Sequence, residues 1–300
     1  MDENKKSADK ISQTYQNFKI DKDYKSVYFF LKENGFSENF ITNLRKQAGF
    51  ILINENVANT ASALKKSDVL SVISNPNRKT TIMQCILPLD IVFEDAYYLL
   101  INKPSGLSTM PNKSHYTNNL AGAICYYMSQ KDPNFTLRVV NRLDKDTSGL
   151  VLVAKSALAL KELSSFEKKY HAICEGIIDK DMVVDQPILT IQENGINNRK
   201  RVISPDGQKA TTYIRPLKQL NNNLSLIELI LVHGRTHQIR VHLSSIGHPL
   251  LGDELYGSKS PKIDHTALIC KEVSFYHPYL KKTLSFSAPY PDDFKLIIEE

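Results

Sequence analysis

The chain has 300 residues, of which 42% are hydrophobic and 23% are charged, and its formal net charge is +6. This composition predicts a soluble globular protein with a large domain and a small appended one, and the positive charge suits a polyanionic partner such as RNA. The four widely spaced cysteines indicate neither a zinc site nor a disulfide framework, so we expect a reducing, cytoplasmic setting. Because no apolar run resembles a signal peptide or a membrane span, we expect no membrane attachment.

The N-terminal part divides into a polar tail and a small folded region. Residues 1–22 are mixed in charge and lack apolar periodicity, which predicts a flexible tail. Residues 23–76 predict two short helices followed by a small sheet. The signals are Ser26 and Ser37 as N-caps, Gly35 and Gly49 as helix ends, and apolar strands at 50–53, 57 and 69–73.

This order of elements resembles the RNA-binding module named after ribosomal protein S-four. The matching stretch is 37–57, followed by 64–70, although Asn56 and Ser67 stand where this module usually carries glycines. The resemblance implies that the region binds RNA. Residues 26–75 hold five basic and four acidic side chains, so their positive charge is too small to attract phosphates strongly. An accessory domain that only packs against the rest of the protein is therefore the alternative.

The sequence of residues 77–300 predicts a linker followed by a larger domain. Polar chain-breaking residues favour a linker at 77–88, and a catalytic domain follows at 89–300. Short apolar runs in this domain alternate with helical patterns, which predicts an α+β class with a largely antiparallel sheet. We expect strands at 91–93, 98–101, 149–154 and 227–232, and helices at 120–128 and 156–169.

A polar loop before a buried strand is the first functional candidate. The stretch 142–149 has the sequence RLDKDTSG and runs directly into the apolar strand at 150–154. Rigid scaffolds often present functional groups from such loops. An ordinary polar turn is the alternative, since Asp, Ser and Gly are common turn residues.

The second candidate is the stretch 234–243, with the sequence GRTHQIRVHL. Apolar residues at helical spacing, with Thr236 as N-cap and Gly247 as C-cap, predict a helix. Arg240 lies in its first turn and can project from the core toward a carboxylate. A guanidinium suits that role because its planar fork binds a carboxylate through two hydrogen bonds.

Together the two stretches resemble the RluA family of pseudouridine synthases, which carries an R-L-D-x-x-T-S-G loop and a G-R-T-H-Q-I-R-V-H helix in this order. Further segments of the family's pattern lie at 94–107, 169–176, 207–212, 252–257 and 286–293. The resemblance covers about residues 89–294. It implies the pseudouridine synthase fold, with a mainly antiparallel mixed sheet flanked by helices, and an isomerase that acts on uridines of structured RNA.

The resemblance also implies a role for each residue of the catalytic centre. Asp144 is the catalytic carboxylate, and Arg240 forms its salt bridge and favours its charged form. Tyr170 lies beside the bound base, where its phenol can take part in removing a proton. Arg142 fills the stack that the flipped uridine vacates.

Several other positions are expected to contact substrate or RNA, or depart from the family's pattern. By the same resemblance, the further contacts come from Arg235, His237 and Lys103. Asn141 stands where most relatives have His, which puts a local hydrogen bond in doubt but not the nucleophile. The basic residues at 168–169 and 199–201 are expected to be mostly solvated surface, with contact to RNA phosphates as the alternative.

The rival interpretations are a metal enzyme and a catalytically silent RNA-binding or ribosome-assembly protein. His233 and His237 are four residues apart, but no Glu lies at the spacing of hydrolytic zinc motifs, so we expect no metal. We also expect no organic cofactor, because the isomerisation that the resemblance implies has no redox change and an intramolecular leaving group. A silent relative would be expected to lack Asp144, Arg240 or Tyr170, and all three are present. Large-subunit ribosomal RNA is the expected substrate and transfer RNA the alternative, and we expect a monomer.

Overall fold

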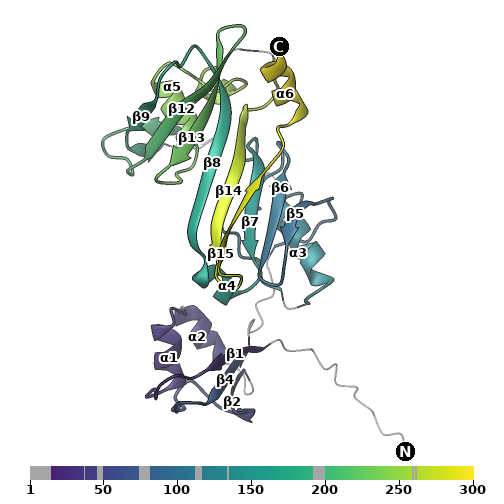
Figure 1. Cartoon of the computed structure of the whole chain (residues 1–300), viewed down its shortest axis with the longest axis vertical. Helices are drawn as coiled ribbons and strands as arrows, with labels where there is room; N and C mark the ends of the chain where they lie inside the picture. The colour runs from purple at the N-terminus through teal and green to yellow at the C-terminus, as the bar shows by residue number, and fades with distance from the viewer. Residues whose placement is uncertain are drawn as a thin grey trace, which may run out of the picture. The chain divides into compact units, whose positions relative to one another are not determined.

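A computed structural model describes residues 15–36, 38–45, 50–73, 82–111, 117–133, 135–191, 200–258, 260 and 262–300. The chain divides into two compact units (Figure 1). The smaller unit comprises residues 1–81 with 128–136, and the larger comprises 82–127 with 137–300. The larger unit therefore begins at Ile82, inside the predicted linker, of which residues 77–81 lie outside the described part.

The smaller unit combines two helices with a four-stranded antiparallel sheet in the order β1-β4-β2-β3. The prediction of a tail up to residue 22 is wrong for β1, which pairs with β4 at the edge of this sheet. The helices and later strands follow the predicted order, whereas the predicted signals at Ser37 and Gly49 lie outside the described residues. The elements are β1 (Tyr15–Lys19), α1 (Val27–Glu33), α2 (Glu38–Leu44), β2 (Ile51–Ile53), β3 (Asn56–Val57) and β4 (Val69–Ile73).

Helix α1 combines a local cap with burial of its apolar face. The Ser26 side chain accepts a hydrogen bond from the backbone N–H of Phe29 at 3.4 Å, which confirms the predicted N-cap. Val27, Phe30 and Leu31 are buried in the core of the smaller unit. Apolar burial of this kind, at about 25 cal/mol per Å², is the main force that stabilises so small a unit.

The larger unit is built on a nine-stranded sheet in the order β5-β6-β7-β14-β8-β13-β12-β9, with β15 beside β14 (Figure 1). Among its described strands only β7 and β14 pair in parallel, so the predicted α+β class with a mainly antiparallel mixed sheet is confirmed. The strands are β5 (Asp90–Glu94), β6 (Tyr98–Lys103), β7 (Ser148–Ala154), β8 (Ser164–Glu175), β9 (Met182–Asp185), β12 (Thr211–Leu220), β13 (Leu224–Leu231), β14 (Leu268–His277) and β15 (Lys282–Ser287), and a separate hairpin consists of β10 (Ile188–Thr190) and β11 (Arg201–Ile203).

The helices flank this sheet, and one of them is shorter than predicted. The helix predicted at 156–169 ends at Glu162, and β8 begins at Ser164. Strand β8 pairs with β14 on one side and β13 on the other, so hydrogen bonding in the middle of the sheet overrides the local helical pattern. The helices are α3 (Leu120–Ser129), α4 (Ala157–Glu162), α5 (Gln238–Ser245) and α6 (Asp292–Glu299), with a 3₁₀ turn η1 (Glu254–Tyr256).

The sheet brings the two sequence motifs to one place. Strand β7 is buried along its whole length and follows directly on the polar loop at 142–147. At Gly149, where β7 meets β14, φ is +103° and a Cβ atom would overlap the backbone of Cys270, so only glycine fits. The chain that leaves β13 leads into α5, and β8 lies between β13 and β14. The loop, β8 and the start of α5 therefore converge.

Candidate active site

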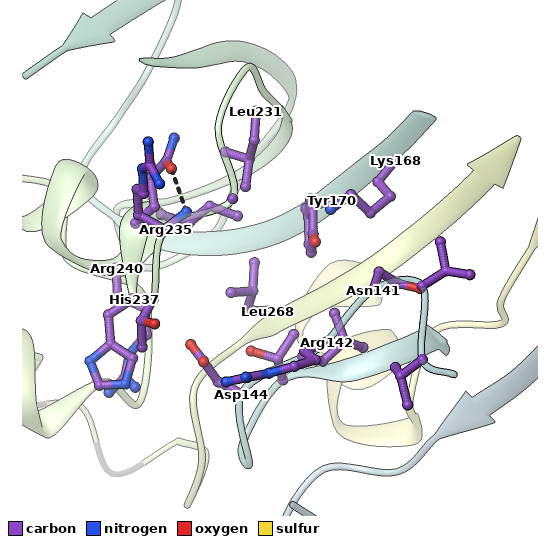
Figure 2. Close-up of a pocket in the computed structure, with 18 residues that line it drawn as sticks. Asn141, Arg142, Asp144, Lys168, Tyr170, Leu231, Arg235, His237, Arg240 and Leu268 are labelled. Atoms are coloured by element: carbon purple, nitrogen blue, oxygen red, sulfur yellow. Dashed lines mark hydrogen bonds between the residues drawn. The ribbon is translucent and has the colours of Figure 1, made fainter. Parts of the chain in front are cut away.

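These three segments line one pocket of about 420 Å³ (Figure 2). The loop before β7 contributes Asp144, β8 contributes Tyr170, and the start of α5 contributes His237 and Arg240. The structure thus brings together residues that are far apart in the sequence. The predicted site residues that line this pocket are Arg142, Asp144, Tyr170, Arg235, His237 and Arg240.

Buried hydrogen bonds fix the backbone next to Asp144. The Thr109 hydroxyl donates to the carbonyl oxygen of Leu143 at 2.6 Å, and its oxygen lies 3.2 Å from the Leu143 backbone N–H, which donates to it. Both residues are buried. The peptide groups before Asp144 therefore have little freedom, which suits a side chain that must be held in one position for chemistry.

Lys103 is not the RNA contact that the sequence predicts. Its side chain is fully buried, and Nζ donates hydrogen bonds to the carbonyl oxygens of Pro104, Leu107 and Lys145 at 2.8, 2.8 and 3.0 Å. Burial lowers the pKa of Lys103 to about 7, although nearby carboxylates oppose this shift. An ammonium group enclosed in this way holds the loop beside Asp144 and does not reach a bound RNA.

Asn141 forms the hydrogen bonds that its departure from the family's pattern had put in doubt. Its Nδ2 donates to the carbonyl oxygen of Leu150 at 3.0 Å, and its Oδ1 accepts from the backbone N–H of Leu152 at 2.9 Å. All three residues are buried. The amide supplies one donor and one acceptor to β7, so two buried backbone groups of this strand are hydrogen-bonded.

Tyr170 is buried in the middle of the sheet, opposite Leu229 on β13 and Cys270 on β14. Burial raises the pKa of the Tyr170 phenol well above its ordinary value, and the charge of Asp144 acts in the same direction. The phenol therefore stays protonated near neutral pH. This favours contact of the aromatic ring with a base over a role as a phenolate that removes a proton.

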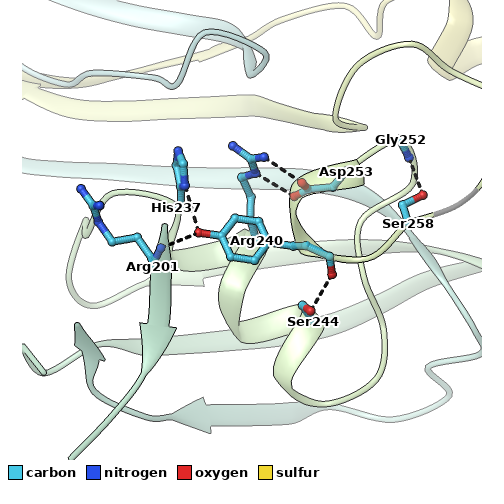
Figure 3. Close-up of polar contacts among 8 residues, drawn as sticks. Arg201, His237, Arg240, Ser244, Gly252, Asp253 and Ser258 are labelled. Carbon is cyan, nitrogen blue, oxygen red and sulfur yellow. Dashed lines mark hydrogen bonds and ion pairs between the residues drawn. The ribbon is translucent and has the colours of Figure 1, made fainter. Parts of the chain in front are cut away.

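Arg240 pairs with a carboxylate other than the one that the sequence predicts (Figure 3). Its Nε and one terminal nitrogen donate to the two carboxylate oxygens of Asp253, each at 2.7 Å. Arg240 is 8% exposed and Asp253 1% exposed, and the structure shows no ion pair between Arg240 and Asp144, both of which it describes. Burial disfavours the positive charge of the Arg240 guanidinium. The hydrogen bonds and charge of Asp253, and to a smaller extent the charge of Asp144, outweigh this effect and raise the pKa of Arg240. Arg240 and Asp144 therefore interact electrostatically without a direct ion pair.

His237 begins α5 and is held by a buried tyrosine. The helix starts at Gln238 with His237 as N-cap at φ +58°, one residue later than the predicted cap at Thr236. His237 Nδ1 lies 3.0 Å from the Tyr256 hydroxyl, whose oxygen accepts the backbone N–H of Arg201 at 3.1 Å (Figure 3). Burial lowers the pKa of His237, and the Asp144 charge opposes this shift, so the ring is mainly neutral near pH 7.

Basic side chains lie at different depths in the pocket. Arg142 and Arg235 are exposed, and the Nε of Arg235 donates to the carbonyl oxygen of Lys209 at 3.1 Å. Lys168, predicted as solvated surface, is half-buried and lines the pocket. The exposed arginines are therefore available to a polyanion at the rim, whereas Lys168 lies deeper.

Sequence reasoning missed three residues of this site: Asp253, Tyr256 and Lys168. The first two lie in the 252–257 segment, which matched the family's pattern without an assigned role. The sequence signal that could have identified Asp253 is an acidic residue directly after the apolar Leu251 and Gly252. For Lys168, the signal was its position two residues before Tyr170, which places both on one face of a strand.

The described residues contain no group of three or more His, Cys, Asp or Glu side chains that could hold a metal ion. A search of the same residues for membrane-spanning helices finds none that is both long and apolar enough.

Comparison with known proteins decides the family. A family model described as RNA pseudouridylate synthase matches residues 97–245. An uncharacterized RNA pseudouridine synthase of Bacillus subtilis, YjbO, is 35% identical over 276 residues, which cover 89% of this chain and 96% of that protein. The chain belongs to the RNA pseudouridine synthase family. It is an isomerase of the RluA type, as the two sequence motifs predict.

Other relatives of this synthase agree in sequence or fold. The ribosomal large subunit pseudouridine synthase D of Zymomonas mobilis is 38% identical over 235 residues, which cover 71% of this chain and 73% of that protein. The solved structure of human RNA pseudouridylate synthase domain containing 4 has a TM-score of 0.56 at 24% identity and covers 70% of this chain and 91% of that one. This structural likeness shows the fold.

Proposed function

We propose that this synthase isomerises specific uridines of large-subunit ribosomal RNA, with Asp144 as the catalytic carboxylate. The observation that carries the catalytic assignment is the pocket in which Asp144 lies with Tyr170 and the buried, charged Arg240. The ribosomal target is supported by several relatives that are named ribosomal large subunit pseudouridine synthase D. Cytoplasmic action as a monomer is part of the proposal.

The reaction needs a carboxylate close to the sugar and a flat site for the base. The N1–C1′ bond of uridine breaks, the uracil turns, C5 bonds to C1′, the C5 proton leaves and N1 gains a proton. Asp144 either attacks or stabilises the electron-poor sugar, for which it must be ionised. Arg240 places a positive charge in the same pocket, and the Tyr170 ring offers a face for the uracil.

Access to the base requires that the uridine leave its stack. Extrusion of a base costs on the order of a few kcal/mol, which a group that fills the gap offsets in part. Arg142 fits this role because it is exposed at the pocket two residues before Asp144. Arg235 is also exposed at the rim and can contact a phosphate, and His237 can donate or accept a hydrogen bond next to Asp144.

The smaller unit is proposed to bind RNA outside the reacting nucleotide. This is supported by α1 and α2 followed by β2, β3 and β4, the order expected of an S-four-like module, although β1 precedes the helices. Lys65 and Lys66 are exposed in the turn before β4 and can contact phosphates. Deletion of residues 1–81 should weaken binding of large-subunit ribosomal RNA, whereas unchanged affinity on every RNA tested would favour an accessory unit that only packs.

The substrate can be tested by treating unmodified large-subunit ribosomal RNA and a transfer RNA pool with the protein. Carbodiimide labelling followed by primer extension then locates each new pseudouridine. The proposal expects modification at defined sites of the ribosomal RNA, with transfer RNA unmodified. Modification of transfer RNA alone would overturn the ribosomal assignment, and RNA binding without any pseudouridine would favour a silent ribosome-assembly protein.

A further inference from the structure

We propose that Lys168 is a further catalytic residue, whose ammonium group binds a carbonyl oxygen of the uracil and stabilises the negative charge that develops when the N1–C1′ bond breaks. This inference rests on the proposed role of the pocket as the uridine site. It assigns to one end of that pocket a function that the Asp144 and Arg240 pattern does not include.

The geometry places the ammonium group where a base would lie. Lys168 and Tyr170 are two residues apart on β8, so both side chains project from the same face of the sheet. Lys168 Nζ lies over the Tyr170 ring, 5.9 Å from its centroid (Figure 2). The same nitrogen is 5.7 Å from the centroid of the Phe166 ring. Stacked rings have centroids roughly 4.5–7 Å apart, so a uracil against Tyr170 would be within reach of this flexible side chain.

The charge of Lys168 has no partner within the described part of the protein. No described carboxylate lies within 4.0 Å of the Lys168 ammonium group, which contacts the rings of Phe166 and Tyr170. Burial lowers the pKa of Lys168, which shows that the protein environment disfavours its charge. Desolvating a cation without a protein anion is unfavourable, and a ligand that carries negative charge would offset the cost.

The chemistry supplies such an anion only during the reaction. When the N1–C1′ bond breaks, its electron pair stays on the uracil and is shared between N1 and the carbonyl oxygens. The N1 pair then moves into an N1–C6 double bond while the pair of the C5–C6 double bond forms the C5–C1′ bond. Loss of the C5 proton restores the C5–C6 double bond, and N1 gains a proton. A cation fixed beside a carbonyl oxygen interacts more strongly with this intermediate than with neutral uridine, and that difference accelerates the reaction.

A phosphate of the RNA is a poorer candidate for the same cation. Arg142 and Arg235 line the same pocket and are exposed, so they are more accessible to a phosphate than Lys168, which is half-buried beside the aromatic ring. The two assignments differ in what they predict. A phosphate contact mainly strengthens RNA binding, and stabilisation of the uracil anion mainly increases the rate at saturating RNA.

Lys169 provides a matched control. It is the next residue on β8, and its side chain points to the opposite face, where Nζ lies 3.3 Å from Glu272 and 3.7 Å from Glu228. It carries the same charge but contributes nothing to the pocket lining. Lys168→Met and Lys169→Met thus remove identical groups from the two faces of one strand.

The experiment measures single-turnover pseudouridine formation at saturating RNA, together with the Kd for RNA, using whichever RNA the wild type modifies. Lys168→Met should lower the rate constant by about 10²–10³-fold with little change in Kd, as when one stabilising donor is removed from an anion site. Lys168→Arg should recover at least about tenfold of that loss because it keeps the charge. Lys169→Met should resemble the wild type. Thermal unfolding of each variant confirms that it is folded.

A Lys168→Met rate constant close to that of the wild type would overturn the proposal. If RNA binding were weaker at the same time, Lys168 would be a phosphate contact. Failure of the ribosomal assignment would appear as activity on a different RNA, and the comparison of the Lys168 and Lys169 variants would then be made on that RNA, so the two failures are distinguishable.

Discussion

Replacement of Asp253 by Asn should both destabilise the larger unit and lower its turnover. The change keeps the shape of the side chain but removes the negative charge that faces Arg240 through two hydrogen bonds of 2.7 Å. Asn has only one oxygen to accept them, and its amide N–H groups would face a guanidinium. Because both groups are buried, the Arg240 charge would lose its compensation.

Breaking a buried pair of this kind costs about 3–5 kcal/mol. For a unit of this size each kcal/mol lowers Tm by about 2–4 °C, so Tm should fall by about 6–20 °C. At a temperature where the variant is folded, kcat should fall with KM nearly unchanged, since Arg240 would lose the orientation that Asp253 gives it in the pocket of Asp144. The assay is calorimetry combined with steady-state pseudouridine formation.

Asp292 provides the control for this experiment. Its side chain is almost fully exposed on α6, and its partner Lys295 is an exposed cation 2.9 Å away. Asp292→Asn should therefore leave both Tm and kcat unchanged, because exposed ion pairs contribute little. An Asp253→Asn variant that behaved in the same way would refute the argument that the buried Asp253 and Arg240 pair orients the site.

Two further predictions concern the support of the catalytic loop. Asn141→Ala should cost about 1–3 kcal/mol for each of the two β7 backbone groups that it leaves unpaired, as measured by urea unfolding, and a loss below about 0.5 kcal/mol would contradict the hydrogen-bond assignment. The pKa of Lys103 is about 7 in the folded protein, below the ordinary value of 10.5, so the unfolded chain binds more protons between these values. The free energy of unfolding should therefore gain a Lys103 contribution as pH rises from about 7 to about 10, visible as a steeper pH dependence in the wild type than in Lys103→Met, and equal slopes would contradict it.

The sequence predicted the elements and residues whose signals are local. Asp144 and Arg240 were singled out because each lies in a continuous motif, and β5, β6, β7 and β13 were predicted because their apolar runs are short and bounded. The edge strand β1 was missed since a polar edge strand buries few side chains. The first half of β8 was predicted as helix because its pairing partners, β13 and β14, lie far away in the sequence.

The contacts within the site depend on tertiary structure and could not be predicted. A sequence motif places Arg240 on a helix but does not say which of two carboxylates it pairs with, and Asp253 lies thirteen residues later in a turn. Lys103 was predicted to contact RNA because it belongs to a family segment, yet burial decides the role of a lysine, and burial depends on the packing around it. The same reasoning explains why the pocket position of Lys168 was missed.

The most direct test of the account is tritium release from RNA labelled at C5 of uridine, since this proton leaves in every turnover. Wild type, Asp144→Ala and the control Asp181→Ala, which removes an exposed carboxylate, would be compared on the same ribosomal RNA. We expect release by the wild type and the control, and none by Asp144→Ala, which should still fold and bind RNA. Release by Asp144→Ala at a rate near that of the wild type would contradict the central claim that Asp144 is the catalytic carboxylate.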